Sequence, residues 1–499
     1  MKQGFALTEA QLELQDDVIE CCTPGHRMGR GFTLLEQGLW FEPGLPKGYL
    51  QMLDDFEKIG RYDHSMSVLE LGSLFAYNPE TALGRAQDYL AGVYGVKFVW
   101  PSTNGTSILN IMALMSCTHP GDSVLLQRDS HVSVYSAIVH HNLEPVYLKP
   151  NYATDLGLPL GVTSQDLEAA LNEHPDIKAV FLTYPNYYGV ATDLEACARL
   201  LHQRGIRLIV DSAHGAHYRF HPDLPLSAEQ TSTALITQSQ HKTCSTLSQG
   251  SLALFNEESL IQPFYEWANL GGFVSTSFSF IILQALVLGV LQLEKQGRTL
   301  LQNALEAAYW AREQVNQIPG LKTFGLEAVR PGFSTLDPLR VTVDVSGLGL
   351  SGFEVCERLM REFNIYPELA TFQNVLLMFT LVDDLRVVRR VVQALRRIAA
   401  DTRGHFQQPR LELPPLPAMR LWPRAALHHR PRRILPLHQA IGQVSAETIS
   451  AYPPGSAIIV GGEEVTAEVV EFLQAVKKLG GSLKGASDPQ FGHIQVLES

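Results

Sequence analysis

The sequence has few cysteines and no excess of positive charge. Its six cysteines are Cys21, Cys22, Cys117, Cys197, Cys244 and Cys356, in a chain of 499 residues. None of them forms a CxxC pair, so neither a metal site nor a disulfide framework is predicted. Asp and Glu outnumber Lys and Arg by 51 to 39, which gives a formal net charge of -12. Because nucleic-acid backbones attract basic surfaces, we expect no nucleic-acid partner.

The sequence also lacks the signals of export and of membrane insertion. Acidic residues such as Glu9 and Asp16 stand where a signal peptide would have a basic start and an apolar run. The longest apolar run, 280–291, is interrupted by Gln284 and Gly289 and is too short to span a bilayer. We therefore expect a cytoplasmic protein with reduced thiols and no membrane partner, and a buried helix over the apolar run.

Alternating helical and apolar segments predict an α/β fold. A chain of 499 residues, 45% of them hydrophobic, is long enough for two or three compact domains. From Glu80 onward, helical stretches alternate with short apolar runs, which predicts a mainly parallel sheet covered by helices on both faces. The predicted strands are 123–126, 145–148, 179–183, 207–210, 234–237 and 251–255.

The pattern changes along the chain, and we predict five segments from it. They are an N-terminal arm over 1–75, a major domain over 76–290, a small α/β domain over 291–406, a Pro/Arg-rich linker over 407–436 and a C-terminal domain over 437–499. The small domain is predicted to contain strands at 340–345 and 375–378 and helices at 352–363 and 383–400. The linker is basic enough to touch RNA or an acidic partner, but an extended, solvated connector is the simpler interpretation.

Two polar residues follow neighbouring predicted strands. Asp211 comes directly after the strand 207–210, and Lys242 lies in Ser239-Gln240-His241-Lys242, after the strand 234–237. A carboxylate can keep a pyridine nitrogen protonated, and a lysine in a loop can form a Schiff base, as pyridoxal-phosphate (PLP) enzymes require. Taken singly, an Asp at a strand end is more often a helix cap, and a lysine is more often a solvated charge. The two together are much more specific.

Two further segments fit the same kind of site. Ser102-Thr103-Asn104-Gly105-Thr106-Ser107 precedes a helical pattern, so its hydroxyls and amides are placed to bind a phosphate at a helix N-terminus. Standing alone, this segment would be interpreted as a capped helix start. His131 follows the strand 123–126, where an imidazole can stack on a pyridine ring or serve as an ordinary polar loop residue.

These motifs resemble the fold type I ornithine/lysine/arginine decarboxylases. The resemblance runs from TPGHRMGRG at 23–31 through STNGTS, RDSHVSV, DSAHGAHYRFHPDLP and SQHKTCSTLSQGS to the C-terminal YPPG. The short length and the DSAHGAH form resemble the compact bacterial arginine/lysine decarboxylase group. The resemblance implies a mainly parallel seven-stranded sheet, smaller C-terminal α/β domains, a PLP cofactor, and a homodimer or higher oligomer with active sites at the subunit interface.

The resemblance also implies roles for individual residues. Lys242 would form the Schiff base, Asp211 would pair with the pyridinium nitrogen, and His131 and Ala213 would lie on opposite faces of the ring. His214 would lie near the phenolic oxygen or the leaving carboxylate, and Lys242 or His241 would donate the proton that replaces the carboxylate. The residues implied around the phosphate are Gly105, Thr106, Ser107, Ser239 and His241. Thr276 would reach the phosphate of a neighbouring subunit, and Glu368 would bind the cationic end of the substrate.

The predicted reaction is decarboxylation of a basic amino acid, releasing CO2 and an amine for polyamine biosynthesis. Arginine is the first candidate substrate, followed by lysine and ornithine. Two alternatives stay open: an aminotransferase or lyase of the same fold, and a catalytically silent regulator that binds PLP or a polyamine. The sequence departs from the family pattern at Gln240, at Thr243-Cys244, at 63–70 and at Gly461-Gly462-Glu463. These departures concern substrate specificity and C-terminal contacts more than the chemistry.

Overall fold

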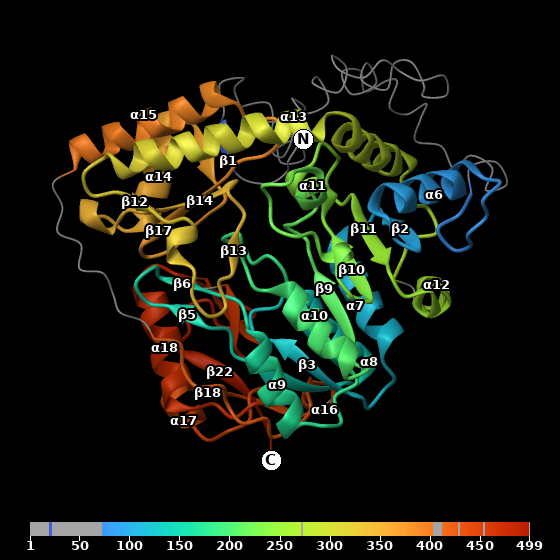
Figure 1. Ribbon diagram of the computed structural model, residues 1–499. Helices are drawn as coiled ribbons and strands as arrows, with labels where there is room; N and C mark the ends of the chain where they lie inside the picture. Colours follow the sequence, from blue (N-terminus) through green and yellow to red (C-terminus); the bar gives the residue numbers. More distant parts are fainter. Residues whose placement is uncertain are drawn as a thin grey trace, which may run out of the picture.

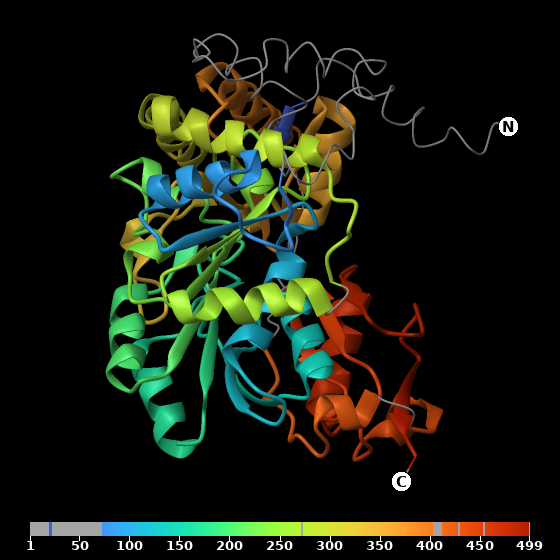
Figure 2. The ribbon, with the colours of Figure 1, turned by 90° about the vertical axis from the view of Figure 1, so that its right-hand side faces the viewer.

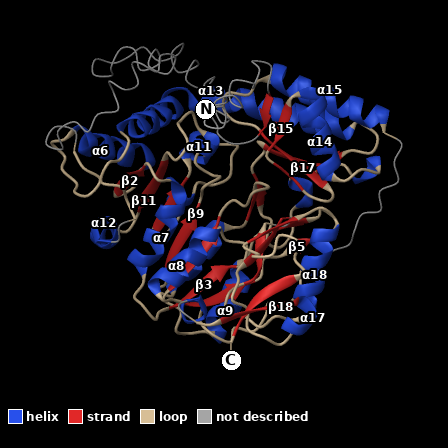
Figure 3. Ribbon diagram, turned by 180° about the vertical axis from the view of Figure 1, so that it is seen from behind, coloured by secondary structure: helices blue, strands red, loops and turns tan. Residues whose placement is uncertain are grey.

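A computed structural model describes residues 19–21, 72–270, 273–402, 412–427, 430–452 and 455–498 (Figure 1). The TPGHRMGRG motif, the departure at 63–70 and most of the predicted N-terminal arm lie outside the described residues. The described part contains one large sheet, a smaller sheet above it and a separate C-terminal unit (Figures 1 and 3).

The large sheet has seven strands, and its topology confirms the predicted fold class. In order across the sheet they are β2 (Phe98–Ser102), β11 (Ser251–Phe255), β10 (Leu235–Gln238), β9 (Arg207–Asp211), β7 (Ala179–Thr183), β3 (Ser123–Gln127) and β4 (Glu144–Leu148). All neighbouring pairs are parallel except those of β11, which is antiparallel to both β10 and β2. The carboxyl ends of the parallel strands therefore meet at one edge, where ligands bind in such sheets.

Helices cover both faces of this sheet, and successive strand residues alternate between the two cores. In β9, Leu208 and Val210 belong to one apolar cluster, whereas Ile209 belongs to the other, as the two-residue period of a strand requires. The first core is covered by α6 (Ala82–Tyr94), α9 (Ser164–Glu173), α10 (Leu194–Gln203) and part of α13 (Phe280–Asn316). The second core is covered by α7 (Gly105–Cys117), α8 (Val132–His141) and α12 (Ile261–Leu270).

The helix α13 confirms the buried helix predicted over 280–291 and extends it to Asn316. Among the described residues, α13 is the one helix that is both long enough and apolar enough to cross a membrane. Half of its most apolar 18-residue stretch, however, is buried inside the protein. Leu286, Val290 and Leu293 pack into the first core. Their packing identifies α13 as a core helix, which continues from the large sheet to the smaller one (Figure 1).

The smaller sheet is antiparallel and confirms the strands and helices predicted for the small domain. Its strands in order are β12 (Lys322–Thr323), β14 (Arg340–Asp344), β17 (Asn374–Met378) and β16 (Leu369–Ala370). The helices α14 (Gly352–Phe363) and α15 (Leu385–Asp401) pack with it, and α15 runs beside α13. The segment β1 (Ile19–Cys21) pairs in parallel with β15 (Ile365–Pro367).

The C-terminal unit has its own apolar core and lies beside α8 (Figure 2). Its strands are β18 (Arg432–Pro436), β19 (Ile449–Tyr452), β20 (Ser456–Ile459), β21 (Ser482–Lys484) and β22 (His493–Leu497), and its helices are α16 (Pro423–Leu427), α17 (Leu437–Ala440) and α18 (Ala467–Lys478). Regular structure thus begins before residue 437, because α16 and β18 fall within the segment predicted as a linker. Arg424 of α16 donates a hydrogen bond to the His140 carbonyl of α8 at 2.9 Å.

Short strand pairs complete the connections near the carboxyl edge of the large sheet. They are β5 (Tyr152–Ala153) with β6 (Leu158–Pro159), and β8 (Val190–Ala191) with β13 (Thr335–Leu336). The pair of β8 and β13 joins the loop after β7 to the segment that leads into β14, so the small domain is held directly above the sheet edge.

Candidate active site

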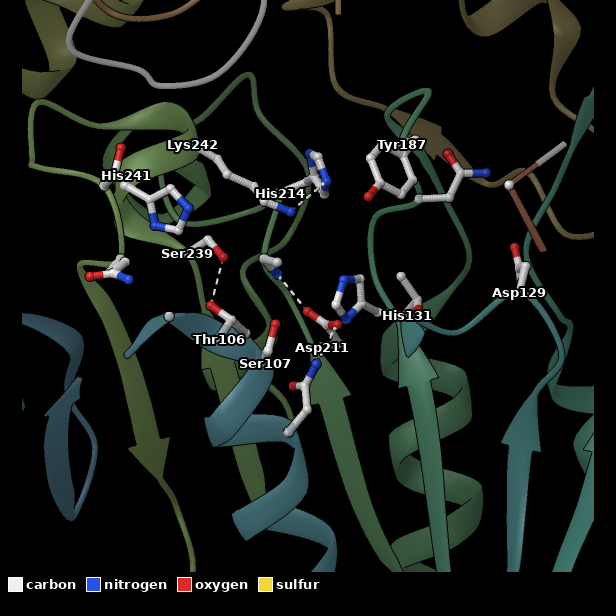
Figure 4. Close-up of a pocket in the computed structure, with 18 of the residues that line it drawn as sticks. Thr106, Ser107, Asp129, His131, Tyr187, Asp211, His214, Ser239, His241 and Lys242 are labelled. Carbon is white, nitrogen blue, oxygen red and sulfur yellow. Dashed lines mark hydrogen bonds between the residues drawn. The ribbon is translucent and has the colours of Figure 1, made fainter. Parts of the chain in front are cut away.

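A cavity of about 540 Å³ opens at the carboxyl edge of the large sheet (Figure 4). Loops after β3, β7, β9 and β10 and the first turn of α7 form its wall. Ten of the twelve predicted site residues line it: Gly105, Thr106, Ser107, His131, Asp211, Ala213, His214, Ser239, His241 and Lys242. The topology brings them together because the parallel strands that precede most of these loops end at the same edge.

Asp211 is the last residue of β9 and is buried, with 4% of its surface exposed. Its Oδ2 accepts a hydrogen bond from Asn110 Nδ2 at 2.8 Å, and its Oδ1 accepts one from the Ala213 amide at 3.0 Å. Both hydrogen bonds fix the direction of this side chain. Asp211 is thus held in one orientation at the floor of the cavity.

Lys242 lies on a short helix, α11 (Gln240–Thr243), and not in the loop that we predicted. Gln240 anchors this turn by donating from Nε2 to the buried hydroxyl of Tyr94 at 3.0 Å. The Lys242 amine points into the cavity and lies 3.1 Å from His214 Nε2. Removal from water lowers the pKa of Lys242; Asp211 and Glu368 oppose this effect, and Arg340 adds to it. A lowered pKa is what a lysine needs to act as a nucleophile.

The segment after Lys242 packs tightly on α13. Gly289 of α13 lies against the Ser245 carbonyl, and a Cβ at this glycine would stand 2.9 Å from that oxygen. A larger side chain here would push the Lys242 turn away from the helix. The glycine that interrupts the long apolar run of the sequence therefore helps to position the lysine.

His214 connects Lys242 to a buried arginine of the small domain. Its Nδ1 lies 3.0 Å from Arg340 Nη2, and its ring centre lies 4.7 Å from that of Tyr187. Burial lowers the pKa of His214 well below its usual value, and the positive charges of Lys242 and Arg340 lower it further. His214 is therefore a neutral imidazole at physiological pH.

The first turn of α7 and the loop before Lys242 form a cluster of hydroxyl groups. Thr106 Oγ1 lies 2.6 Å from Ser239 Oγ and donates to Ser251 Oγ at 3.0 Å. Gly105 has a φ of 77°, and a Cβ at this position would meet nothing within 4 Å. Open space, hydroxyl groups and the amides of a helix N-terminus together suit a phosphate group.

His131 caps α8 and lies beside Asp211 in the cavity (Figure 4). Its Nδ1 lies 2.9 Å from Ser133 Oγ and accepts from the Ser133 amide at 3.2 Å. Burial is the largest influence on His131 and lowers its pKa, while Asp211 acts in the opposite direction. The ring is thus fixed at the cavity wall and is predominantly neutral.

Glu368 lines a second cavity of about 470 Å³, which adjoins the first. His131, Tyr187, Tyr188 and Gly455 line both cavities. Further walls of the second cavity come from the segment around Glu368 in the small domain and from Tyr452 and Lys484 in the C-terminal unit. The residue predicted to bind the substrate side chain therefore stands next to the lysine-containing cavity.

Thr276 does not line either cavity and is exposed on the surface of this single chain. The resemblance assigns it to the phosphate of a neighbouring subunit, which this structure does not contain. That contact stays a prediction.

Several residues in the cavity or beside it were not predicted from the sequence. Asn110 carries an amide inside the apolar helix α7, which is a signal that could have drawn attention to it. Tyr187 and Asp129 also line the cavity. Asp129 lies in the RDSHVSV motif, in which only His131 was given a role, and Tyr187 lies in none of the motifs. Arg340 begins β14 and resembles an ordinary strand residue in the sequence. Among the described residues, no group of three or more His, Cys, Asp or Glu side chains is placed to hold a metal ion.

The fold and the lysine-containing cavity define a fold type I enzyme. Two family models match the chain: Orn/Lys/Arg decarboxylase, major domain, over residues 14–386, and Orn/Lys/Arg decarboxylase, C-terminal domain, over residues 408–489. The chain therefore belongs to the Orn/Lys/Arg decarboxylase family. The predicted family and the predicted class of enzyme, an amino acid decarboxylase, are both confirmed.

Individual relatives agree with this assignment. An arginine decarboxylase from Bacillus subtilis (strain 168) is 32% identical over 462 residues, which cover 91% of this chain and 94% of the relative. A lysine decarboxylase from Francisella novicida has a similar structure, with a TM-score of 0.76, 23% identity, and coverage of 96% of this chain and 78% of that chain. The fold is also found in ureidoglycine-glyoxylate aminotransferase from Bacillus subtilis, with a TM-score of 0.51, 14% identity, and coverage of 65% and 86%.

Proposed function

We propose that the chain decarboxylates a basic amino acid with pyridoxal phosphate as its cofactor. The observation that carries the proposal is the position of the Lys242 amine, in one cavity with the Asp211 carboxylate and the hydroxyl groups of Thr106 and Ser239. When bound, pyridoxal phosphate supplies an aldehyde for the lysine and a protonated ring that accepts electrons from the substrate.

The cavity fits this cofactor on three counts. Gly105 leaves open space beside the hydroxyl cluster, which suits the phosphate. Asp211 presents a carboxylate fixed by two donors, which suits a protonated ring nitrogen. His131 and Ala213 both line the cavity and would hold the two faces of the ring. Ser107, Ser239 and His241 would complete the surroundings of the phosphate.

The chain's own residues then orient the substrate and move a proton. The neutral His214 lies beside Lys242 and would lie near the departing carboxylate, where an imidazole without charge would not stabilise that carboxylate in the ground state. The carboxylate leaves as CO2, and one proton takes its place on the same carbon. Lys242 is the proposed proton donor at Nζ. His241 is the alternative donor, and its Nδ1 lies 3.0 Å from the Gly250 carbonyl.

The second cavity supports a substrate with a cationic side chain. Glu368 lines it, and this carboxylate acts electrostatically on Lys242, so the cavity connects the reacting amine with an acidic group. Arginine is the first proposed substrate, because the arginine decarboxylase from Bacillus subtilis matches over nearly the full length of both chains. Lysine is the second and ornithine the third. The amine product would enter polyamine synthesis, in the cytoplasm.

An aminotransferase, the alternative enzyme of this fold, needs an arginine that binds the substrate carboxylate. The lining of the lysine-containing cavity includes no arginine among the described residues. Arg340 is near but is engaged with His214. This arrangement favours loss of the carboxylate over its retention.

The test is CO2 release from arginine, lysine and ornithine, assayed separately with PLP-loaded wild type and Lys242→Ala. Release from one substrate by the wild type alone would support the proposal and identify the substrate. If the wild type binds PLP but releases CO2 from none of the three, the decarboxylase proposal is wrong. Amino-group transfer to a keto acid would then be measured.

A further inference from the structure

Arg340 is a buried cation next to the catalytic cavity. It has 1% of its surface exposed, and its guanidinium meets His214 Nδ1 at 3.0 Å. Its Nε lies 3.7 Å from the Asp337 carboxylate. Arg312 of α13 donates to the Arg340 carbonyl at 2.7 Å, so the backbone of this residue is braced as well. The guanidinium therefore has a fixed place in the structure.

The loop after β7 closes over the same side chain. Gly189 has a φ of 78°, and a Cβ at this position would stand 2.6 Å from Arg340 Cγ. Arg340 is absent from the lining of both cavities. A substrate in those cavities would not touch it. Its hydrogen-bond path to Lys242 runs through His214, and its charge also acts on Lys242 directly.

The hydrogen-bonding roles along this path follow from the chemistry of the groups. A guanidinium only donates, so His214 Nδ1 must accept and cannot carry a proton. In a neutral imidazole the proton then lies on Nε2, which faces Lys242 Nζ at 3.1 Å. Because Nε2 donates, the lysine nitrogen must offer its lone pair. A charged ammonium group has no lone pair to offer.

We propose that Arg340 is a positioning residue that fixes His214 in its Nε2-protonated form and thereby keeps the Lys242 amine uncharged, ready to bind a carbonyl group. The inference deepens the proposed function, on which it rests. It gives the small domain a part in preparing the lysine of the major domain.

Other charged and titratable groups also face Lys242 and have to be considered. They are Asp211 on β9, His131 at the start of α8, Tyr187 after β7, His241 on α11 and Glu368 beside β16. The two carboxylates favour the ammonium form, whereas His214 and Arg340 favour the free amine. Removing Arg340 should therefore shift the balance toward the ammonium form.

The experiment measures the rate at which acetic anhydride acetylates Lys242 in cofactor-free protein, as a function of pH. Mass spectrometry of the peptide that contains Lys242 gives the extent of acetylation. Only the free amine reacts. For Arg340→Gln we expect acetylation at pH 8 to be about tenfold slower than in the wild type. Without the guanidinium donor, His214 can carry its proton on Nδ1, so that Nε2 accepts a hydrogen bond from the ammonium form of Lys242 and raises the lysine pKa. Arg340→Lys keeps a donor and a charge and should react like the wild type. The exposed Lys178 serves as the internal control.

A second comparison separates the path through His214 from a direct charge effect. In a His214→Phe background, the further change Arg340→Gln should slow acetylation less than twofold. Equal rates for folded Arg340→Gln and wild type would overturn the inference, and so would a full effect in the His214→Phe background. Circular dichroism and thermal unfolding establish that each variant is folded.

A third measurement needs no Arg340 variant. In wild type labelled with ¹⁵N-histidine, the His214 signals, identified by their loss in His214→Gln, should show a protonated Nε2 and an unprotonated Nδ1. The reverse pattern would also overturn the inference. None of these measurements uses substrate or CO2 release, so a failure of the proposed decarboxylation would be seen separately.

Discussion

Asn110 shows how one amide can organise a charged site inside an apolar helix. Its Nδ2 donates to Asp211 at 2.8 Å and to Ser133 Oγ at 3.1 Å, and its Oδ1 accepts from Thr237 at 2.6 Å. Ser133 in turn contacts His131. The orientations of the proposed ring partner and of the proposed stacking residue thus depend on the same buried group, whose hydrogen-bonding capacity is almost fully used.

Asp129 is a carboxyl group whose ionisation is made less favourable by burial. Its Oδ1 is buried without a hydrogen-bond partner among the described residues, and burial raises its pKa from 3.8 to about 6. Between these two values the folded chain holds a proton that the unfolded chain has lost, so this group makes the protein less stable as pH rises from 4 to 6. Above that range the cost of ionisation is about 3 kcal/mol in total.

We predict that Asp129→Asn, which mimics the protonated acid, becomes more stable relative to the wild type as pH rises. The difference in the free energy of unfolding should grow by about 2 kcal/mol between pH 4 and pH 7. Urea unfolding of both proteins at the two pH values measures this difference. A difference that stays constant with pH would contradict the prediction.

The secondary-structure elements were predicted from the sequence more completely than the site was. The runs 179–183 and 251–255 became β7 and β11, and the helix 352–363 became α14 with the same bounds. Short apolar runs bounded by loops are strong strand signals. Ser351 caps α14 with Glu354 three residues later, which is a signal for a helix start that depends on neighbouring residues alone.

What the sequence did not predict depends on contacts between distant segments. Lys242 lies on a helical turn because Gln240 is tied to Tyr94, which is 146 positions earlier. Arg340 reaches the cavity region because β13 pairs with β8, and no local pattern contains that pairing. The predicted motif residues meet in one cavity because each follows a strand or starts a helix at the same edge of the sheet. The order and direction of the strands are enough to bring such residues together.

A buried ion pair joins the end of β3 to the turn after β20. Arg128 donates from Nη1 and Nη2 to the two oxygens of Glu463, each at 2.7 Å, and both side chains are almost fully buried. Glu463 belongs to the segment where the sequence departs from the family pattern. The C-terminal unit is thus attached to the large sheet by a bidentate pair of charge-assisted hydrogen bonds, which are stronger than hydrogen bonds between neutral groups.

We predict that Glu463→Gln lowers the free energy of unfolding by about 3–5 kcal/mol, because it leaves the Arg128 charge buried without its counter-charge. The next residue provides the control. Glu464 pairs with Arg420 at the surface, and Glu464→Gln should cost less than about 1 kcal/mol. Thermal and urea unfolding measure both variants. If both variants lose the same free energy of unfolding, the buried ion pair stabilises the protein no more than the surface pair.

The cavities lie where three parts of the chain meet. His131 comes from the major domain, Glu368 from the small domain and Lys484 from the C-terminal unit, and all three line the second cavity. A fourth contribution is predicted from a neighbouring copy of the chain, through Thr276. Its exposure in the single chain leaves it available for such a contact.

We predict that active sites are shared between two copies. Lys242→Ala and Thr276→Glu should each abolish activity, the first by removing the amine and the second by placing a negative charge beside the phosphate of the other copy. Co-expressed in equal amounts, they should recover about one quarter of wild-type activity, because half of the dimers are mixed and each mixed dimer has one intact site. CO2 release and sedimentation measure the outcome. If the mixture stays inactive although mixed dimers form, Thr276 does not act across the interface.

The position of β2 at the edge of the large sheet affects how the nascent chain folds during synthesis. β2, at 98–102, pairs with β11, at 251–255, and is separated by it from the other five strands. On the ribosome, the first strand of this sheet must wait for about 150 more residues before its partner emerges. Until then an apolar strand stays unpaired, which is the condition under which nascent chains aggregate or recruit chaperones. Nascent chains halted before residue 251 should bind chaperones far longer than chains released after residue 260.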